Sequence, residues 1–408
     1  MLTDRSWRPL AGLCALALGV VLTRDQLGDY TLGASDDNAA PAIHYLAGGD
    51  VAAAVEAMPA MGLVSILLRV PAAAAAGSDL LLAHRIGSLL CLLAAVALAY
   101  VLDRKAAADG RPVAYRIAVG VLVVAGPAVL WSFDSGHPEE VLGGALCVAA
   151  VVAAVEQRAL AAAVLLGLAI GTKQWAVLAI VPALLPIGEP RWLDPQRLKA
   201  GALAALVAAI FVVPPIAASP SRYSEISRNL SGTSRVYPAS LWWPVAKTRH
   251  QEIGLGGGET TALTTWSLPL GLTRGPATSI AVLLSLALVP LAFAREGLRD
   301  PLGALAILLT ARTMLDPMNL GYYVAPALLA WAAWEVWRGP AMRLPWVSIV
   351  AATAAYAAWS LGHGRDPVVY WAVWMCATVP LLFAVRLGER PQSSGPSGAT
   401  PAGPGSAV

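Results

Sequence analysis

Charged residues are scarce in this chain. Only 13% of its 408 residues are Asp, Glu, Lys or Arg, whereas an ordinary soluble domain has about 25%. Hydrophobic residues make up 57% of the chain, and the mean hydropathy is +0.65. A soluble protein of this length cannot bury so much apolar surface in one core, and an apolar chain of low charge is not disordered. The composition therefore predicts an integral membrane protein.

Cysteine is also rare, and the basic residues do not cluster. The four cysteines lie inside apolar runs, without a CxxC pair or a nearby His at ligand spacing, so we expect small hydrophobic core residues. They are Cys14, Cys91, Cys147 and Cys376. The net charge of +3 and the lack of a basic run with interleaved aromatic residues argue against a nucleic-acid partner.

The apolar runs predict an all-α, polytopic bundle of about 12 transmembrane helices. They fall at 9–23, 80–102, 113–131, 139–155, 159–171, 174–187, 200–217, 277–294, 302–315, 323–338, 345–361 and 368–386. The first follows Arg5 and Arg8 and lacks a small-x-small cleavage site, so we interpret it as an uncleaved helix. Arg69 and two prolines interrupt the apolar stretch 59–76, which predicts an interfacial or re-entrant segment.

Basic loops set the expected orientation. Short loops rich in Lys and Arg occur at 103–116, 188–199, 295–299 and 338–343, and the positive-inside rule puts them in the cytoplasm with both termini. The number of membrane crossings between the cytoplasmic loops 103–116 and 188–199 must then be even. Because 113–131 and 139–155 give two crossings, 159–187 must go out and come back, through an outward turn at Gly171–Gln174. We expect one membrane domain over 1–387 and a disordered cytoplasmic tail over 388–408, which is rich in Pro, Gly and Ser.

Three polar segments then face outward, and they carry most of the unexplained titratable residues. They are 24–58, 132–138 and 218–276. The first contains Asp36 and Asp37 before an expected interfacial helix. Asp37 or Asn38 fits an N-cap for that helix, which leaves one carboxylate free to accept a proton. The second holds His137, and Glu139 follows it directly. Pro138 and the acids after it suit the first turn of the next helix. A role in helix capping does not explain His137, which indicates acid–base work or contact with an anion.

Further polar residues lie on the same predicted side. Lys173 is either a lysine that snorkels to the interface or a cation for a phosphate head group. Arg312 is either the partner of Asp316 four residues later or a donor to phosphate oxygens. The long segment 218–276 adds aromatic and basic residues, including Trp242 and Trp243, that suit either a sugar contact or an interfacial belt.

This one-sided grouping favours a lipid-phosphate substrate. The lipid chain would stay in the bilayer, fixed cations would stabilise the departing phosphate, and a carboxylate would take a proton from an acceptor hydroxyl. A transporter would instead show polar residues along its pore on both sides of the membrane. We keep a transporter or flippase of a lipid-linked sugar or amphiphile as the alternative.

Several segments together resemble the membrane-embedded C-type glycosyltransferases, in particular the bacterial branch that uses polyprenyl-phosphate mannose. The resemblance rests on the first helix, the acidic first loop, Met58–Gly62, Gly136–Glu139 and Gly167–Trp175, and it covers roughly 1–385. It implies an inverting transfer of a hexose such as mannose to a cell-envelope lipid or glycan on the outer face of a bacterial plasma membrane. It also implies an acidic base in the first loop, here Asp36 or Asp37.

The topology and the resemblance together give a set of candidate site residues. We expect Lys173, His137, Arg312 and Tyr322 to contact the donor phosphate. We expect Glu139, Trp242 and Trp243 to contact the sugar or the acceptor. No set of metal ligands is evident, so we expect no metal or other cofactor. The expected partners are a polyprenyl-phosphate sugar donor, a lipid or glycan acceptor and membrane lipids.

Overall fold

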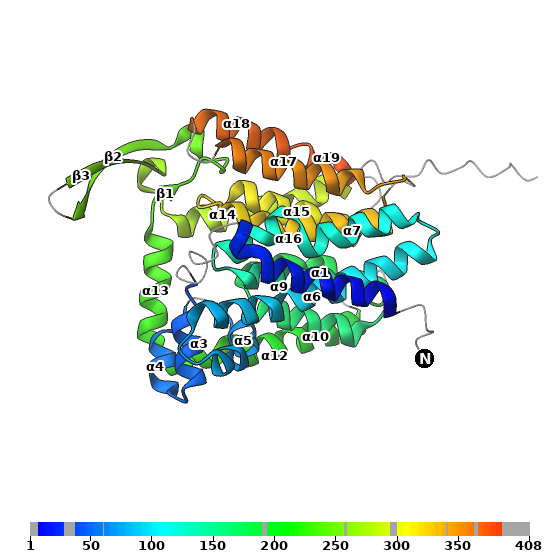
Figure 1. Cartoon of the computed structure of the whole chain (residues 1–408). Helices are drawn as coiled ribbons and strands as arrows, with labels where there is room; N and C mark the ends of the chain where they lie inside the picture. Colours follow the sequence, from blue (N-terminus) through cyan, green and yellow to red (C-terminus); the bar gives the residue numbers. More distant parts are fainter. Residues whose placement is uncertain are drawn as a thin grey trace, which may run out of the picture.

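The structure is a computed structural model that describes residues 7–27, 37–59, 61–189, 194–256, 259–293, 300–339, 342–362 and 366–385. Most of these residues form helices whose axes run roughly side by side (Figure 1). The N-terminal half contains α1 (Trp7–Leu27), α3 (Ala40–Ala47), α4 (Val51–Glu56), α5 (Leu63–Ala76), α6 (Leu80–Ala108), α7 (Val113–Ala125), α8 (Pro127–Asp134), α9 (Pro138–Val155), α10 (Ala159–Ile170), η1 (Gln174–Ala179), α11 (Ile180–Leu184) and α12 (Pro195–Ala218). The expected tail over 388–408 lies outside the described residues.

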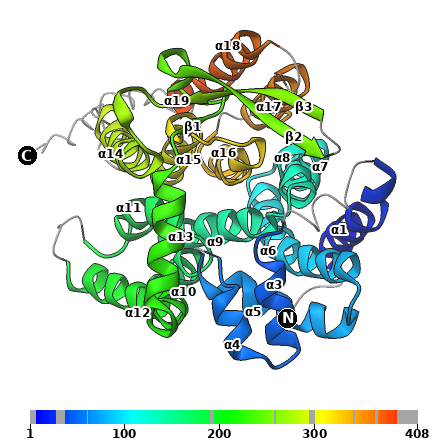
Figure 2. The same ribbon diagram turned by 90° about the vertical axis from the view of Figure 1, so that its left-hand side faces the viewer.

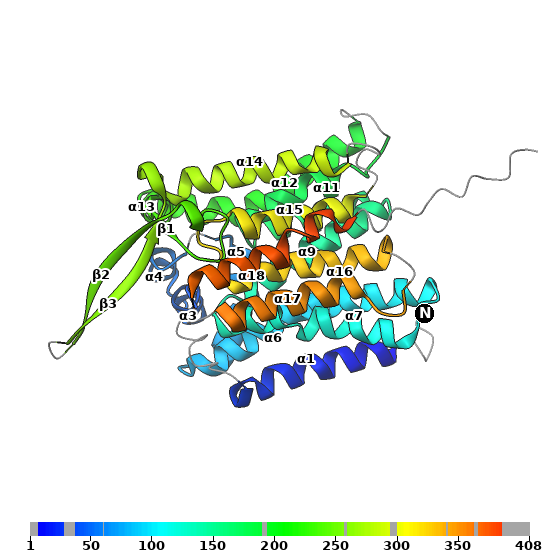
Figure 3. The ribbon, with the colours of Figure 1, turned by 90° about the horizontal axis from the view of Figure 1, so that it is seen from above.

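The second half adds a small sheet to further helices. Its elements are α13 (Pro220–Gly232), β1 (Arg235–Val236), η2 (Trp243–Val245), β2 (Lys247–Gly256), β3 (Glu259–Ser267), η3 (Pro269–Gly271), α14 (Arg274–Phe293), α15 (Pro301–Leu315), η4 (Gly321–Val324), α16 (Ala325–Trp337), α17 (Trp346–Gly362), α18 (Pro367–Thr378) and α19 (Leu381–Ala384). Figure 3 shows the ribbon of β2 and β3 extending away from the bundle.

Helix α9 forms the centre of the bundle. It packs against α6, α10, α15 and α16. In its most apolar stretch 83% of the residues are buried, whereas the corresponding share in α12 is 22%. Small residues allow this close packing: a Cβ atom on Gly144 would lie 2.9 Å from the backbone of Pro326 in α16. Because Glu139 and Glu140 lie in the first turn of this central helix, they are placed inside the bundle.

The described helices support a membrane protein. Five helical segments among the described residues are long and apolar enough to cross a bilayer. They are Leu80–Ala108, Val113–Asp134, Pro138–Val155, Pro195–Ala218 and Pro367–Ala384. Other apolar helices are shorter, such as Ala159–Ile170, so the count of twelve crossings and the orientation stay predictions. Two of the four cysteines, Cys14 and Cys376, are exposed on their helices, which corrects our expectation that all four lie in the core.

Two predictions about local structure can be compared directly with the fold. The predicted break in 159–187 is present, because α10 ends at Ile170 and η1 begins at Gln174. In the stretch 59–76, α5 continues through Pro71 as one helix packed on α3 and α6, and its interfacial or re-entrant placement stays a prediction.

Loops and short elements gather at one end of the bundle, which we call the α13 end because it carries α13, α3, α4 and the sheet (Figure 2). The sheet has the order β1-β3-β2 and is antiparallel, with Lys247 paired to Ser267 and Ile253 to Thr261. An all-α prediction misses this sheet. Residues 171–174 reach the same end, since Gln174 donates a hydrogen bond to the Tyr223 hydroxyl of α13 at 2.7 Å. The end of 132–138 meets them there, because Lys173 contacts Glu139, the residue that follows this segment.

Candidate functional site

The turn between α8 and α9 places two acidic side chains inside the protein. Gly136 adopts a left-handed conformation with φ of 70°, which favours glycine, and the His137 amide donates to the Ser132 carbonyl at 2.7 Å. Pro138 then begins α9, so Glu139 and Glu140 fall in its first turn. Both residues are only 1% exposed. Two buried carboxylates need cations or donors close by.

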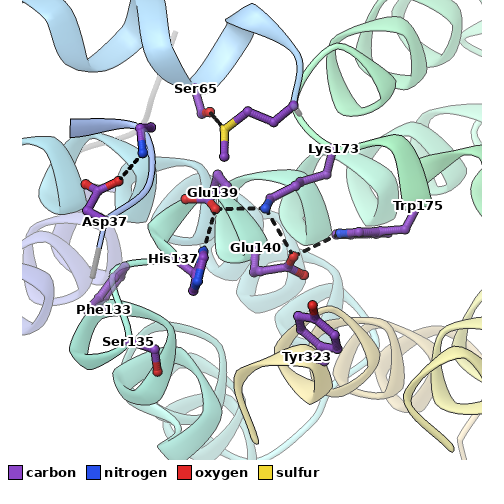
Figure 4. A network of polar contacts seen from close by, with 12 residues as sticks. Asp37, Ser65, Phe133, Ser135, His137, Glu139, Glu140, Lys173, Trp175 and Tyr323 are labelled. Atoms are coloured by element: carbon purple, nitrogen blue, oxygen red, sulfur yellow. Dashed lines mark hydrogen bonds and ion pairs between the residues drawn. The ribbon is translucent and has the colours of Figure 1, made fainter. Parts of the chain in front are cut away.

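Glu139 contacts two of the predicted site residues (Figure 4). Its Oε1 atom lies 2.9 Å from Lys173 Nζ and 3.0 Å from His137 Nδ1. Its Oε2 atom is buried and has no hydrogen-bond partner among the described residues. Burial alone would lower the pKa of Lys173, but the charges of Glu139 and Glu140 outweigh burial and raise that pKa. Lys173 therefore carries a positive charge beside a carboxylate oxygen that can still accept a hydrogen bond.

Glu140 contacts hydrogen-bond donors from η1, from the turn before η1 and from α15. Its Oε1 accepts from Trp175 Nε1 at 3.1 Å and lies 3.7 Å from Lys173 Nζ, and its Oε2 accepts from Arg312 at 3.4 Å. The Arg312 guanidinium lies 4.6 Å from the ring centres of both Trp175 and Tyr323. The two rings and the carboxylate fix the plane of this guanidinium.

The two tyrosines of η4, Tyr322 and Tyr323, lie beside these charged residues. The Tyr322 ring stacks on His137, with the ring centres 4.4 Å apart, and burial raises the pKa of Tyr322. The Tyr323 hydroxyl accepts a hydrogen bond from Arg274 at 3.3 Å. Arg274 also pairs with Asp316 at 3.4 Å. Of the two alternatives for Arg312, the pairing with Asp316 is therefore wrong, because each residue has a partner from another part of the chain.

Asp37 lies in a buried ion pair at the same end. Its side chain is 1% exposed and contacts the guanidinium of Arg69 and, at 3.2 Å, Nδ1 of His84. Its Oδ1 also accepts from the Ala39 amide at 3.0 Å. The N-cap residue of α3 is Ala39, so the predicted N-cap role of Asp37 or Asn38 is wrong.

These contacts keep Asp37 ionised. Burial would raise the pKa of Asp37, but the Arg69 charge and the hydrogen bond with His84 outweigh burial and lower that pKa. The other predicted base, Asp36, lies outside the described residues.

A backbone contact ties the start of α5 to the turn that holds Lys173. The Val64 amide of α5 donates to the Gly171 carbonyl at 3.1 Å. A Cβ atom on Gly62 would overlap that carbonyl group. Only a residue without a side chain fits at position 62, so the start of α5 and the end of α10 meet at backbone distance.

The two predicted tryptophans lie in a separate apolar cluster. Trp242 and Trp243 pack with Val236, Leu268 and Trp266, and Trp242 Nε1 donates to the Leu315 carbonyl at 2.5 Å. No contact joins either tryptophan to Glu139 or Lys173 within the described ranges. Their role as sugar or acceptor contacts stays a prediction.

The sequence reasoning missed several members of the group. Arg69, His84 and Arg274 were not assigned to the site, and Glu140, Trp175 and Tyr323 were not given roles in it. A lone Arg or His in an apolar run signals a buried partner, but the sequence does not show which residue that partner is. The described residues contain no group of three His, Cys, Asp or Glu side chains that could hold a metal ion, and independence from metal stays a prediction.

Comparison with known proteins adds a family. The family model for glycosyltransferase family 87 matches residues 62–317. The match includes Arg69, His84, the 132–138 turn, Lys173 and Arg312, whereas Asp37 and Tyr322 lie outside it. The search of curated proteins gave no significant match.

Proposed function

The chain belongs to glycosyltransferase family 87, and from this membership we propose that it transfers a sugar from a polyprenyl-phosphate donor to a lipid or glycan acceptor of the cell envelope. The sugar is a hexose such as mannose. The site faces outward from a bacterial plasma membrane, both termini are cytoplasmic, and membrane lipids surround the prenyl chain of the donor.

One observation carries this proposal: a lysine, an arginine and a histidine converge on two adjacent buried carboxylates, one of which has a free oxygen. Lys173 and His137 both contact Glu139, and Arg312 lies against Glu140 next in the chain. Lysine and arginine are suitable donors to phosphate oxygens. The free Oε2 of Glu139 is suited to accept a hydrogen bond from a sugar hydroxyl. A phosphate joined to a sugar satisfies both requirements in one molecule.

The proposed reaction is a single displacement. A carboxylate of the first loop takes the proton of the acceptor hydroxyl, and the acceptor oxygen attacks the anomeric carbon opposite the phosphate. The bond from that carbon to the phosphate oxygen breaks, its electron pair leaves with the phosphate, and the configuration inverts. Lys173, Arg312 and His137 stabilise the negative charge that develops on the leaving group, with Tyr322 placed against His137.

The contacts of Asp37 bear on the choice of base. Both of its oxygens accept from Arg69, His84 or the Ala39 amide. Taking a proton at Asp37 would mean giving up one of these contacts at a group whose pKa is already lowered. We therefore assign the base first to Asp36 and second to Asp37.

The test is transfer from a polyprenyl-phosphate hexose in membranes that contain the protein. We expect Asp36→Asn to abolish transfer while the protein still inserts. Asp50→Asn is the matched control, because Asp50 is an exposed acid of the same loop that caps α4, and asparagine also caps. Normal turnover in Asp36→Asn, Asp37→Asn and the double variant would refute the base assignment.

A second measurement separates transfer from transport. Reconstituted vesicles with the donor on one side would show a new glycosidic bond for an enzyme. Movement of the lipid-linked sugar without a new bond would support the alternative of a transporter or flippase instead.

A further inference from the structure

His84 lies where two segments of the candidate site meet. It belongs to the first turns of α6, and its side chain is 2% exposed. Its Nδ1 atom lies 3.2 Å from Asp37 Oδ2, and its Nε2 atom lies 3.1 Å from the carbonyl oxygen of Phe133. Phe133 is in the last turn of α8, just before the turn that carries His137. A single imidazole therefore contacts the first loop and the 132–138 segment.

The two partners indicate which nitrogens of the ring donate hydrogen bonds. A backbone carbonyl only accepts hydrogen bonds, and so does an ionised carboxylate. A neutral imidazole has one N–H group, whereas the imidazolium has two and can donate to both partners. The Asp37 carboxylate that contacts this ring also contacts Arg69, and the charge of Glu139 reaches Asp37. One carboxylate is thus shared by a guanidinium and an imidazole.

We propose that His84 is a positioning residue that donates from both ring nitrogens and thereby fixes the first loop against the 132–138 turn. The first loop carries the base assigned above, and the turn carries His137 and leads into Glu139 of α9. This inference rests on the proposed function, because correct spacing between base and donor site matters only if a transfer occurs there. A misplacement of about 1 Å can cost on the order of 10²-fold in rate.

Isosteric variants separate the two hydrogen bonds. An asparagine amide reaches the position of Nδ1, and a glutamine amide reaches that of Nε2, so His84→Asn keeps the Asp37 contact and His84→Gln keeps the Phe133 contact. His84→Leu keeps neither. Ser88→Ala is the matched control, because it removes a buried hydroxyl 3.5 Å from Nε2 and leaves both of these contacts in place.

The kinetic result follows from the role. We expect His84→Leu to lower kcat by about 10²-fold with the donor KM changed by less than about 3-fold, since no donor contact is lost. We expect the Asn and Gln variants to recover part of this loss, and Ser88→Ala to match the parent. Parental kcat in His84→Leu, or no recovery in folded Asn and Gln variants, would overturn the proposal.

Hydrogen exchange of the full-length protein in detergent gives a readout independent of activity. His84→Asn should speed exchange in 132–138 but not in 37–47, and His84→Gln should do the reverse. The same change in both variants, or none in either, would overturn the proposal even if His84→Leu fails to insert. If the parent protein shows no transferase activity but the exchange pattern holds, the proposed function fails and the positioning contact survives.

Discussion

Lys173 is expected to contribute strongly to stability, because it is the cation shared by two buried carboxylates. Its Nζ atom lies 2.9 Å from one oxygen of Glu139 and 3.7 Å from one oxygen of Glu140. With an effective dielectric constant of 20, these distances correspond to about 6 and 4 kcal/mol of attraction. The cost of desolvating the three charges offsets much of this. Removing one partner of a buried ion pair costs about 3–5 kcal/mol, because the remaining charge stays buried.

The perturbation is Lys173→Met, which keeps the length of the side chain and removes the charge. We expect a loss of about 3–5 kcal/mol of stability, because two carboxylates that are 1% exposed lose their shared cation. The double variant Lys173→Met with Glu139→Gln should recover at least half of this loss, since one of the two carboxylates is then neutral.

Thermal unfolding in detergent, followed by tryptophan fluorescence, measures both variants. Lys105→Met is the control, because Lys105 pairs with Asp109 at the surface and such pairs contribute less than about 1 kcal/mol. An unchanged unfolding midpoint in Lys173→Met, or additive losses in the double variant, would refute the reasoning that Lys173 neutralises these acids.

Three further predictions follow from other contacts. Gly144→Ala should destabilise by about 1–3 kcal/mol because the new Cβ meets the backbone of α16, whereas Gly19→Ala meets nothing within 4 Å; unfolding midpoints compare the two. Arg312→Lys should raise the donor KM several-fold, because lysine keeps the charge but loses the planar group held between two rings; parental kinetics would contradict this. Because the pKa of Asp37 is lowered, its ion pair stabilises the fold fully above about pH 4, and this contribution is lost as the pH falls further. Asp37→Asn should therefore reduce the fall of the thermal unfolding midpoint at acid pH.

Sequence reasoning located the part of the site that lies at helix ends. His137, Glu139 and Lys173 are polar residues at the borders of apolar runs, and such borders fix where a chain turns. The structure brings these three residues together. Whether they bind a donor phosphate is still a prediction, but their convergence follows from the positions of the helix ends.

Local sequence patterns could not identify the partners of the buried charges. Arg312 pairs with Glu140, which is 172 residues away, while the i, i+4 spacing pointed to Asp316. Asp37 pairs with Arg69, and no local pattern links the two positions. Such pairings depend on which helices become neighbours, and that is decided by the packing of small residues such as Gly144. The strand β3 was missed because a Thr-rich segment between membrane helices carries no apolar alternation.

The close approach of Gly62 and Gly171 joins the start of α5 to the end of α10 through backbone contacts. Because no side chain separates the two backbones, a displacement of the chain before α5 would also displace the turn that positions Lys173. If the proposed function holds, a substitution that shifts the start of α5 would therefore also alter the position of Lys173 and with it the contacts to the donor phosphate.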